Sequence, residues 1–155
     1  MRTGDAIPTL PPDGFVRQFF EPSIHEAVTL YPGPAAMTPQ SLRWGIHRVE
    51  DVVRHIRFPI PPLRNLHYEF LFLKTGRGGR TDGLNRYEVG PGTVYLSAPG
   101  QIVSSEFCSA DATGFYCFFY GDVVLTSLQN GRFLDELPFF QPAAVPLVTV
   151  SERLL

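Results

Sequence analysis

Residues 80–107 read RTDGLNRYEVGPGTVYLSAPGQIVSSEF and contain three turn signals in close succession. The signals are spaced 9 and 8 residues apart, and short strands at such spacing are typical of a β-sandwich or β-barrel. The first signal predicts a tight β-hairpin, because a type I′ turn needs a positive φ at both of its central residues and Asp-Gly supplies them. The three signals are Asp82-Gly83, Pro91-Gly92 and Pro99-Gly100.

Segments on both sides of this region also have the patterns of strands. Residues 68–74 are apolar on both faces apart from Glu69, which predicts a central strand of a sheet. Residues 42–49 alternate between apolar and other residues, the pattern of a half-buried strand. The aromatic segment 114–120 predicts a strand that is covered on both faces. The other predicted strands are Asp51–Phe58, Thr93–Ser97, Ile102–Phe107 and Leu147–Val150.

The composition agrees with a single, mainly β domain. The 155 residues include 14 Gly and 15 Pro, which a helical bundle would not tolerate because each interior Gly costs ~1 kcal/mol and each Pro ~3 kcal/mol. Hydrophobic residues make up 44% of the chain and charged residues 18%. That apolar content is enough for one sizeable core and excludes intrinsic disorder of the whole chain.

The two ends of the chain have different patterns from the middle. Residues 1–41 predict an irregular, proline-rich arm with one short element around 15–20, which we expect to cover a pocket or a partner subunit. The β domain is expected to occupy residues 42–150. Within it, residues 122–131 predict a short helix and residues 132–137 a second helical turn. Residues 151–155 resemble the first turn of a helix that has been cut.

Charge and hydropathy exclude several classes of function. The net charge is −2 and the pI is about 6.1, whereas DNA-binding domains usually have a basic patch and often a pI above ~9. The longest apolar runs are far shorter than the ~20 residues of a membrane-spanning helix, and no signal-peptide pattern opens the chain. We therefore expect a cytoplasmic protein with no membrane partner.

Motifs for enzymatic or metal chemistry are absent from the sequence. The four histidines have none of the usual metal-site spacings, and a metal site needs three or four converging ligands. There is no G-x-S-x-G nucleophile elbow. The Gly-rich segment 76–79 leads into a hairpin instead of a helix N-terminus, so it lacks the physical basis for phosphate binding. The sequence predicts no catalytic residues, no metal and no other cofactor.

The candidate binding residues are polar and aromatic side chains on the predicted strands. Glu69 lies either at the exposed end of its strand or in a polar pocket, because burying a carboxylate without a partner is costly. Residues 116, 118 and 120 share one face of their strand, and a small barrel edged by tyrosines can hold a small organic ligand. The predicted ligand-binding residues are Glu69, Tyr95, Gln101, Tyr116, Phe118 and Tyr120.

Three segments carry a resemblance to a known family. They are YEVGPGTVYLSAPGQ at 87–101, GFYCFFY at 114–120 and NGRFLDELPFF at 130–140, following the Tyr68-Glu69 strand. In this order they resemble the N-terminal cupin-type regulatory domain of AraC-family transcription regulators, over residues 42–155. The resemblance implies a cupin-like barrel of the double-stranded β-helix, or jelly-roll, type. It also implies that the domain senses a small-molecule effector and forms a homodimer.

In that family a separate C-terminal domain with two helix-turn-helix units binds DNA. The resemblance therefore implies that DNA is bound only through a domain absent from this chain, which would stop near the interdomain helices. Metal-binding cupins place histidines near the positions of His67 and Val103, and the valine at the second position disfavours a metalloenzyme. Two alternatives stay open: a stand-alone metal-dependent cupin isomerase or dioxygenase, and a dimerisation module that binds no ligand.

Overall fold

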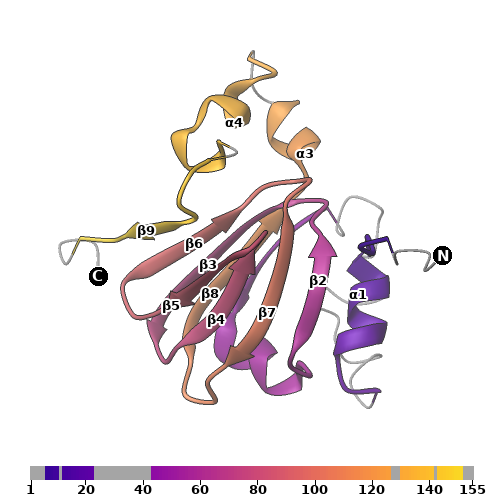
Figure 1. The fold of residues 1–155 in the computed structure, drawn as a ribbon, viewed down its shortest axis with the longest axis vertical. Coiled ribbons are helices and arrows are strands. Elements are labelled where there is room, and N and C mark those ends of the chain that lie inside the picture. The colour runs from indigo at the N-terminus through magenta and orange to yellow at the C-terminus, as the bar shows by residue number, and fades with distance from the viewer. Residues whose placement is uncertain (1–5, 11, 23–42, 127–129, 142, 152–155) are drawn as a thin grey trace.

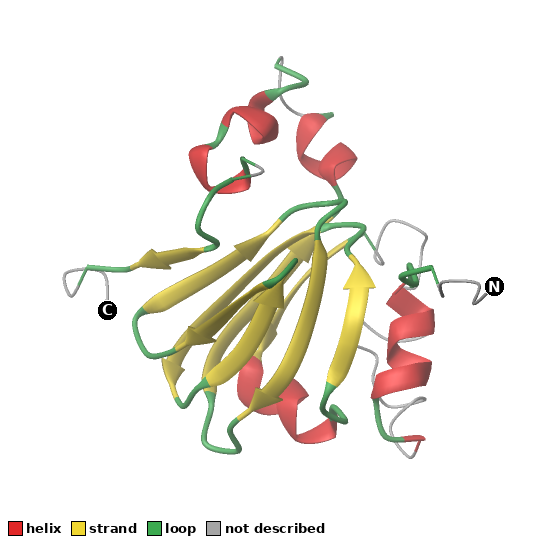
Figure 2. Ribbon diagram, viewed as in Figure 1, coloured by secondary structure: helices red, strands yellow, loops and turns green. Residues whose placement is uncertain are grey.

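The computed structural model describes residues 6–10, 12–22, 43–126, 130–141 and 143–151. These residues form two antiparallel sheets with a few short helices (Figures 1 and 2), which confirms the prediction of a mainly β protein. The strands are β1 (Trp44–Arg48), β2 (Ile60–Arg64), β3 (Tyr68–Thr75), β4 (Gly78–Asp82), β5 (Asn85–Val89), β6 (Thr93–Ser97), β7 (Ile102–Cys108), β8 (Thr113–Phe119) and β9 (Leu147–Thr149).

The two sheets have five and four strands. The strand order is β1-β8-β3-β6-β9 in one sheet and β2-β7-β4-β5 in the other. The described strands do not close into a single barrel, because no ladder joins an edge strand of one sheet to an edge strand of the other. The expectation of a closed barrel is corrected accordingly, and the arrangement of these strands is that of a β-sandwich.

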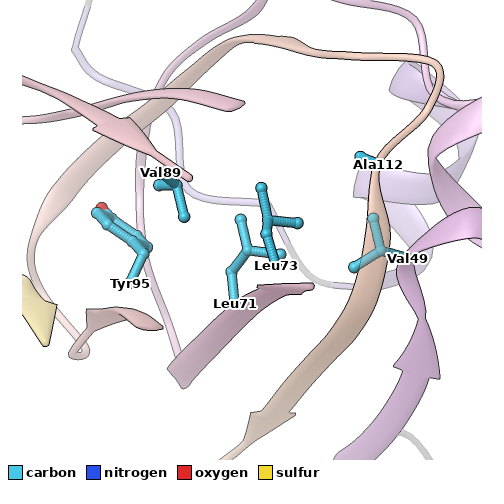
Figure 3. Packing of buried hydrophobic residues seen from close by; sticks show 6 residues of the cluster. All are labelled: Val49, Leu71, Leu73, Val89, Tyr95 and Ala112. Atoms are coloured by element: carbon cyan, nitrogen blue, oxygen red, sulfur yellow. The ribbon is translucent and has the colours of Figure 1, made fainter. Parts of the chain in front are cut away.

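The predicted central strand lies at the centre of the five-stranded sheet, as β3 between β6 and β8. Its residues alternate between the two faces of the sheet, as the pleat requires. On the inner face, Leu71 and Leu73 contribute to the core between the sheets (Figure 3). The buried members of this inner core are Val49, Leu71, Leu73, Val89, Tyr95 and Ala112.

The outer face of the same sheet is covered by short helices. These are α3 (Gly121–Leu125), α4 (Phe133–Glu136) and the 3₁₀ turn η4 (Pro138–Phe140). The ring of Tyr68 stacks on Phe119 at 5.2 Å and meets Phe140 edge-on at 4.7 Å, measured between centroids. Both predicted helical segments are confirmed in part, although residues 127–129 lie outside the described residues. The helices cover only part of this face, because Phe115 on β8 is 53% exposed, so the expectation that 114–120 is covered on both faces is wrong at this residue.

An N-terminal helix packs beside the edge strand of the four-stranded sheet. This helix is α1 (Pro12–Phe19), seen next to β2 in Figure 1, and it contains most of the element expected around 15–20. Phe19 is buried in one cluster with Ile60 and Leu63 of β2. The Arg57 N–H donates to the Phe19 carbonyl at 2.7 Å, which ties the end of α1 to the sheet. Residues 1–5, 11 and 23–42 of the predicted arm lie outside the described residues.

The strand predicted over Asp51–Phe58 is wrong. The chain there forms α2 (Val49–Val52) followed by the 3₁₀ turn η3 (Val53–His55). The apolar positions 49, 52, 53 and 56 are spaced i, i+3, i+4 and i+7, which places them on one face of a helical segment. That face closes one end of the space between the sheets.

Two details of the strands also differ from expectation. In β1 the apolar residues Trp44 and Ile46 are 53% and 62% exposed, while Gly45 and His47 point inward. In the predicted hairpin, Asp82 pairs with Asn85, so the central turn residues are Gly83 and Leu84. Only Gly83 of these two has a positive φ, +58°, so the turn is not of type I′.

None of the helices in the described part of the chain is long and apolar enough to span a membrane.

Candidate functional site

A cavity of about 180 Å³ lies between the two sheets. Most of its wall is apolar and comes from three directions: the inner faces of both sheets, the segment α2–η3 and the N-terminal segment with α1. The N-terminal contribution consists of Leu10, Phe15 and Phe20, so α1 forms part of the cavity wall. The cavity becomes polar where β3 of one sheet faces β4 of the other.

Strand register places the residues of the polar end. Glu69 on β3 lies between Ser97 on β6 and Phe118 on β8. Gly45 of β1 follows in the same row, and a Cβ there would approach the Phe118 ring to 2.9 Å. Glycine at this position therefore leaves room for the Phe118 ring. The next inward row consists of Tyr95, Leu71, Tyr116 and His47.

Glu69 is held in a buried polar network. Its carboxylate pairs with the Arg80 guanidinium at 2.6 Å, and the two side chains are only 5% and 15% exposed. Its second oxygen accepts a hydrogen bond from the Ser97 hydroxyl at 3.2 Å. That hydroxyl in turn accepts one from the Asn65 amide at 2.7 Å. The sequence allowed two positions for Glu69, and the structure places it in a buried polar pocket and not at an exposed strand end.

Arg80 reaches Glu69 from the opposite sheet. It lies on β4, where a bulge occurs in the pairing with β7: Gly79 pairs with Phe107, but Arg80 pairs with Ser105. A bulge redirects side chains and is common beside functional sites. The Arg80 guanidinium lies over the Tyr95 ring, 5.2 Å from its centroid. The ion pair thus connects the two sheets across the polar end of the cavity.

Two histidines line the cavity beside the ion pair. His67 precedes β3, with its Nε2 atom 3.5 Å from the Tyr116 hydroxyl and its ring 5.3 Å from that of Phe118. Burial lowers the pKa of His67, with smaller effects of Glu69 and Arg80 that oppose each other. Burial likewise lowers the pKa of His47, which stacks on Phe118 with 6.1 Å between centroids. Both imidazoles are therefore neutral at neutral pH.

The structure brings some of the six predicted ligand-binding residues together and separates others. Glu69, Tyr116 and Phe118 line the cavity. Tyr95 is fully buried in the core behind Arg80, and its hydroxyl has no hydrogen-bond partner within the part of the chain that the structure describes. Gln101 accepts a hydrogen bond from the Ala98 N–H at 2.6 Å at a turn.

Tyr120, the sixth predicted residue, is not among the residues that line the cavity. Its ring is 5.9 Å from that of His67, and the Arg43 guanidinium lies 5.0 Å from its centroid. Sequence reasoning missed most of the cavity wall, including the polar or ionisable residues His47, Arg64, Asn65, His67, Arg80, Ser104, Ser105 and Cys108. One signal could have found Arg80: a carboxylate inside an apolar strand requires a buried partner, and Arg80 lies on the adjoining hairpin.

The described residues contain no group of three or more His, Cys, Asp or Glu side chains that could hold a metal ion. The sequence matches no protein-family model and no curated protein. The candidate site therefore rests on its own geometry: a mostly apolar, partly open cavity with one polar end, built around a cross-sheet ion pair.

Lowering the pH should destabilise the fold through His67. Its pKa is below 6.5 in the folded state, so the unfolded chain takes up this proton first as the pH falls. The contribution of His67 to the free energy of unfolding is then fully present above about pH 7.5 and is lost as the pH falls through about 6.5 towards the lower pKa of the folded state. Urea unfolding between about pH 7.5 and 5.5 should show this loss, and His67→Gln should reduce its slope. An unchanged slope in His67→Gln would contradict this assignment.

Proposed function

We propose that this chain is the effector-sensing domain of an AraC-family transcription regulator, with a cupin-like arrangement of its two sheets. The observation that carries the proposal is the cavity of about 180 Å³ between the sheets. Concave sites with mostly apolar walls and a few convergent polar groups are typical binding sites for small organic molecules. The regulator family comes from the resemblance of residues 87–101, 114–120 and 130–140.

The N-terminal helix offers a route from ligand binding to regulation. Leu10, Phe15 and Phe20 line the cavity, so an effector there would contact the segment that contains α1. An effector changes a regulator only if it binds two states with different affinities. In this proposal the two states differ in how α1 packs on β2, and a homodimer presents attached DNA-binding domains accordingly.

Filling the cavity should abolish effector binding. Val103 lies on β7 and lines the cavity, so Val103→Phe places a ring in the space that a ligand would use. In a thermal-shift screen of small organic compounds, we expect binders that raise the Tm of the wild type and not that of this variant. A ligand at 100 times its Kd adds about 2.7 kcal/mol of stability, which is a shift of several °C.

The matched control is Val148→Phe on β9, where the valine is 41% exposed and does not line the cavity. This variant should respond to the binders as the wild type does. If Val103→Phe also responds fully, the ligand binds elsewhere and the cavity is not the sensing site.

The regulator assignment has tests independent of the ligand. We expect the gene's reading frame around these residues to encode a basic domain with two helix-turn-helix patterns. Light scattering of the purified chain should give the mass of a dimer. A frame without such a domain, together with a stoichiometric transition metal in the purified protein, would instead favour a metal-dependent cupin enzyme.

A further inference from the structure

The interior of the cavity contains one positive and one negative charge. These belong to Arg80 and Glu69, which pair at 2.6 Å. Among the described residues that line the cavity, Arg64 is the one other side chain with a permanent charge. It is exposed at the rim, where its guanidinium donates to the Gly100 carbonyl at 3.0 Å. The buried part of the cavity therefore has no net charge.

The other titratable groups in the wall do not change this balance. Burial lowers the pKa of His47 and His67 and raises the pKa of the Cys108 thiol, so all three are neutral at about pH 7.5. The Tyr116 hydroxyl lies beside His67, 3.5 Å from its Nε2 atom. These groups offer hydrogen bonds to a ligand without offering it a counter-charge.

A charged ligand would meet an unfavourable site. A carboxylate at the Arg80 guanidinium would have to share this one cation with Glu69, and two like charges would lie buried side by side. A cation would compete with Arg80 for Glu69 in the same way. Breaking a buried pair leaves an uncompensated charge, which is strongly unfavourable where water is excluded. A neutral ligand leaves the pair intact.

The volume of the cavity indicates how large a part of a ligand it can enclose. An apolar cavity of about 150 Å³ can hold benzene in another protein, and this cavity has about 180 Å³. Building on the sensing function proposed above, we propose that the cavity selects an uncharged effector of about one six-membered ring. Its hydrogen-bonding group faces Glu69, Arg80 and His67, and carboxylates or amines of the same shape are rejected.

Three probes of one shape test this selection. Benzamide, benzoate and benzamidine share a ring and differ in charge, and their cyclohexane counterparts repeat the comparison with a saturated ring. With the full chain at about pH 7.5, ligand-observed NMR should give the neutral amides a Kd at least tenfold lower than those of both charged series. This binding should disappear in Val103→Phe.

The possible results separate the two proposals. If the charged probes bind as tightly as the amides, and Val103→Phe still abolishes binding, the selection for neutral ligands is wrong while the sensing cavity stands. If neither these probes nor a broader set of small compounds binds the wild type, both proposals are wrong.

Glu69→Gln tests whether the ion pair is the cause. The amide keeps an acceptor for Arg80 but removes the negative charge, so the buried cation becomes available to an anion. Benzoate should then raise the Tm of this variant more than benzamide does, the reverse of the wild-type order. A wild-type order of preference in folded Glu69→Gln would overturn the assigned cause. If the variant does not fold, the wild-type probe series decides.

Discussion

Replacing Arg80 by Met should lower the free energy of unfolding by about 3–5 kcal/mol, the cost of breaking a buried ion pair. Methionine has a similar length and fills much of the same space, so the main change is the loss of the charge. Glu69, whose side chain is only 5% exposed, would then lie beside Ser97 without a cation to pair with. The Arg80 contact with the Tyr95 ring, at 5.2 Å, would be lost as well. Urea unfolding at neutral pH measures the difference.

A surface ion pair provides the matched control. Arg77 and Glu88 approach to 3.7 Å, but their side chains are 68% and 62% exposed. Exposed pairs contribute little, so Arg77→Met should change the free energy of unfolding by less than about 1 kcal/mol. A double replacement of Glu69 and Arg80 by apolar residues should cost less than Arg80→Met alone, because it leaves no unpaired charge. If Arg80→Met costs no more than Arg77→Met, the pair is not desolvated.

The pair of Glu69 and Arg80 shows how much of the site can be predicted from the sequence. The interruption of an apolar strand by Glu69 is a local signal, and it correctly raised the possibility of a polar pocket. The partner could not be chosen from the pattern, because Arg80 approaches from the other sheet and a bulge sets its direction. Strand alternation is local information, whereas contact between two sheets depends on their packing.

Turn signals and apolar patterning predict most of the strands, but they miss β2, where the prolines at 61 and 62 suggest a break. The bounds of Thr93–Ser97 agree fully, because turns fix both of its ends. The strand prediction for residues 51–58 fails because the valines at 49, 52 and 53 have helical spacing and form α2 and η3. In β1, Trp44 points outward because the inward row beside Phe118 has room only for Gly45. Periodicity shows which residues of a strand share a face, but it does not show whether that face points into the core or toward solvent.

Replacing Gly114 by Ala should lower the free energy of unfolding by about 3 kcal/mol or more. Gly114 has a φ of +150°, and strain in such a region costs about 1–3 kcal/mol for other residues. A Cβ there would also overlap the Phe72 carbonyl oxygen and lie 3.0 Å from the Leu73 Cα. Both are backbone atoms of β3, so the clash can be relieved only by moving one strand against the other.

The position of Gly114 makes this a test of the site as well as of the fold. It lies near the start of β8, the strand that presents Tyr116 and Phe118 to the cavity. Thermal unfolding should show a loss of about 10 °C or more, while Gly83→Ala should cost about 1 kcal/mol. Gly83 also has a positive φ, +58°, but no atom lies within 4 Å of a Cβ built there.

Equal effects of the two variants would mean that backbone strain alone matters and that β3 and β8 separate easily. In that case the cavity, whose polar end depends on the register of these two strands, would not be the rigid site that discriminates between ligands by charge.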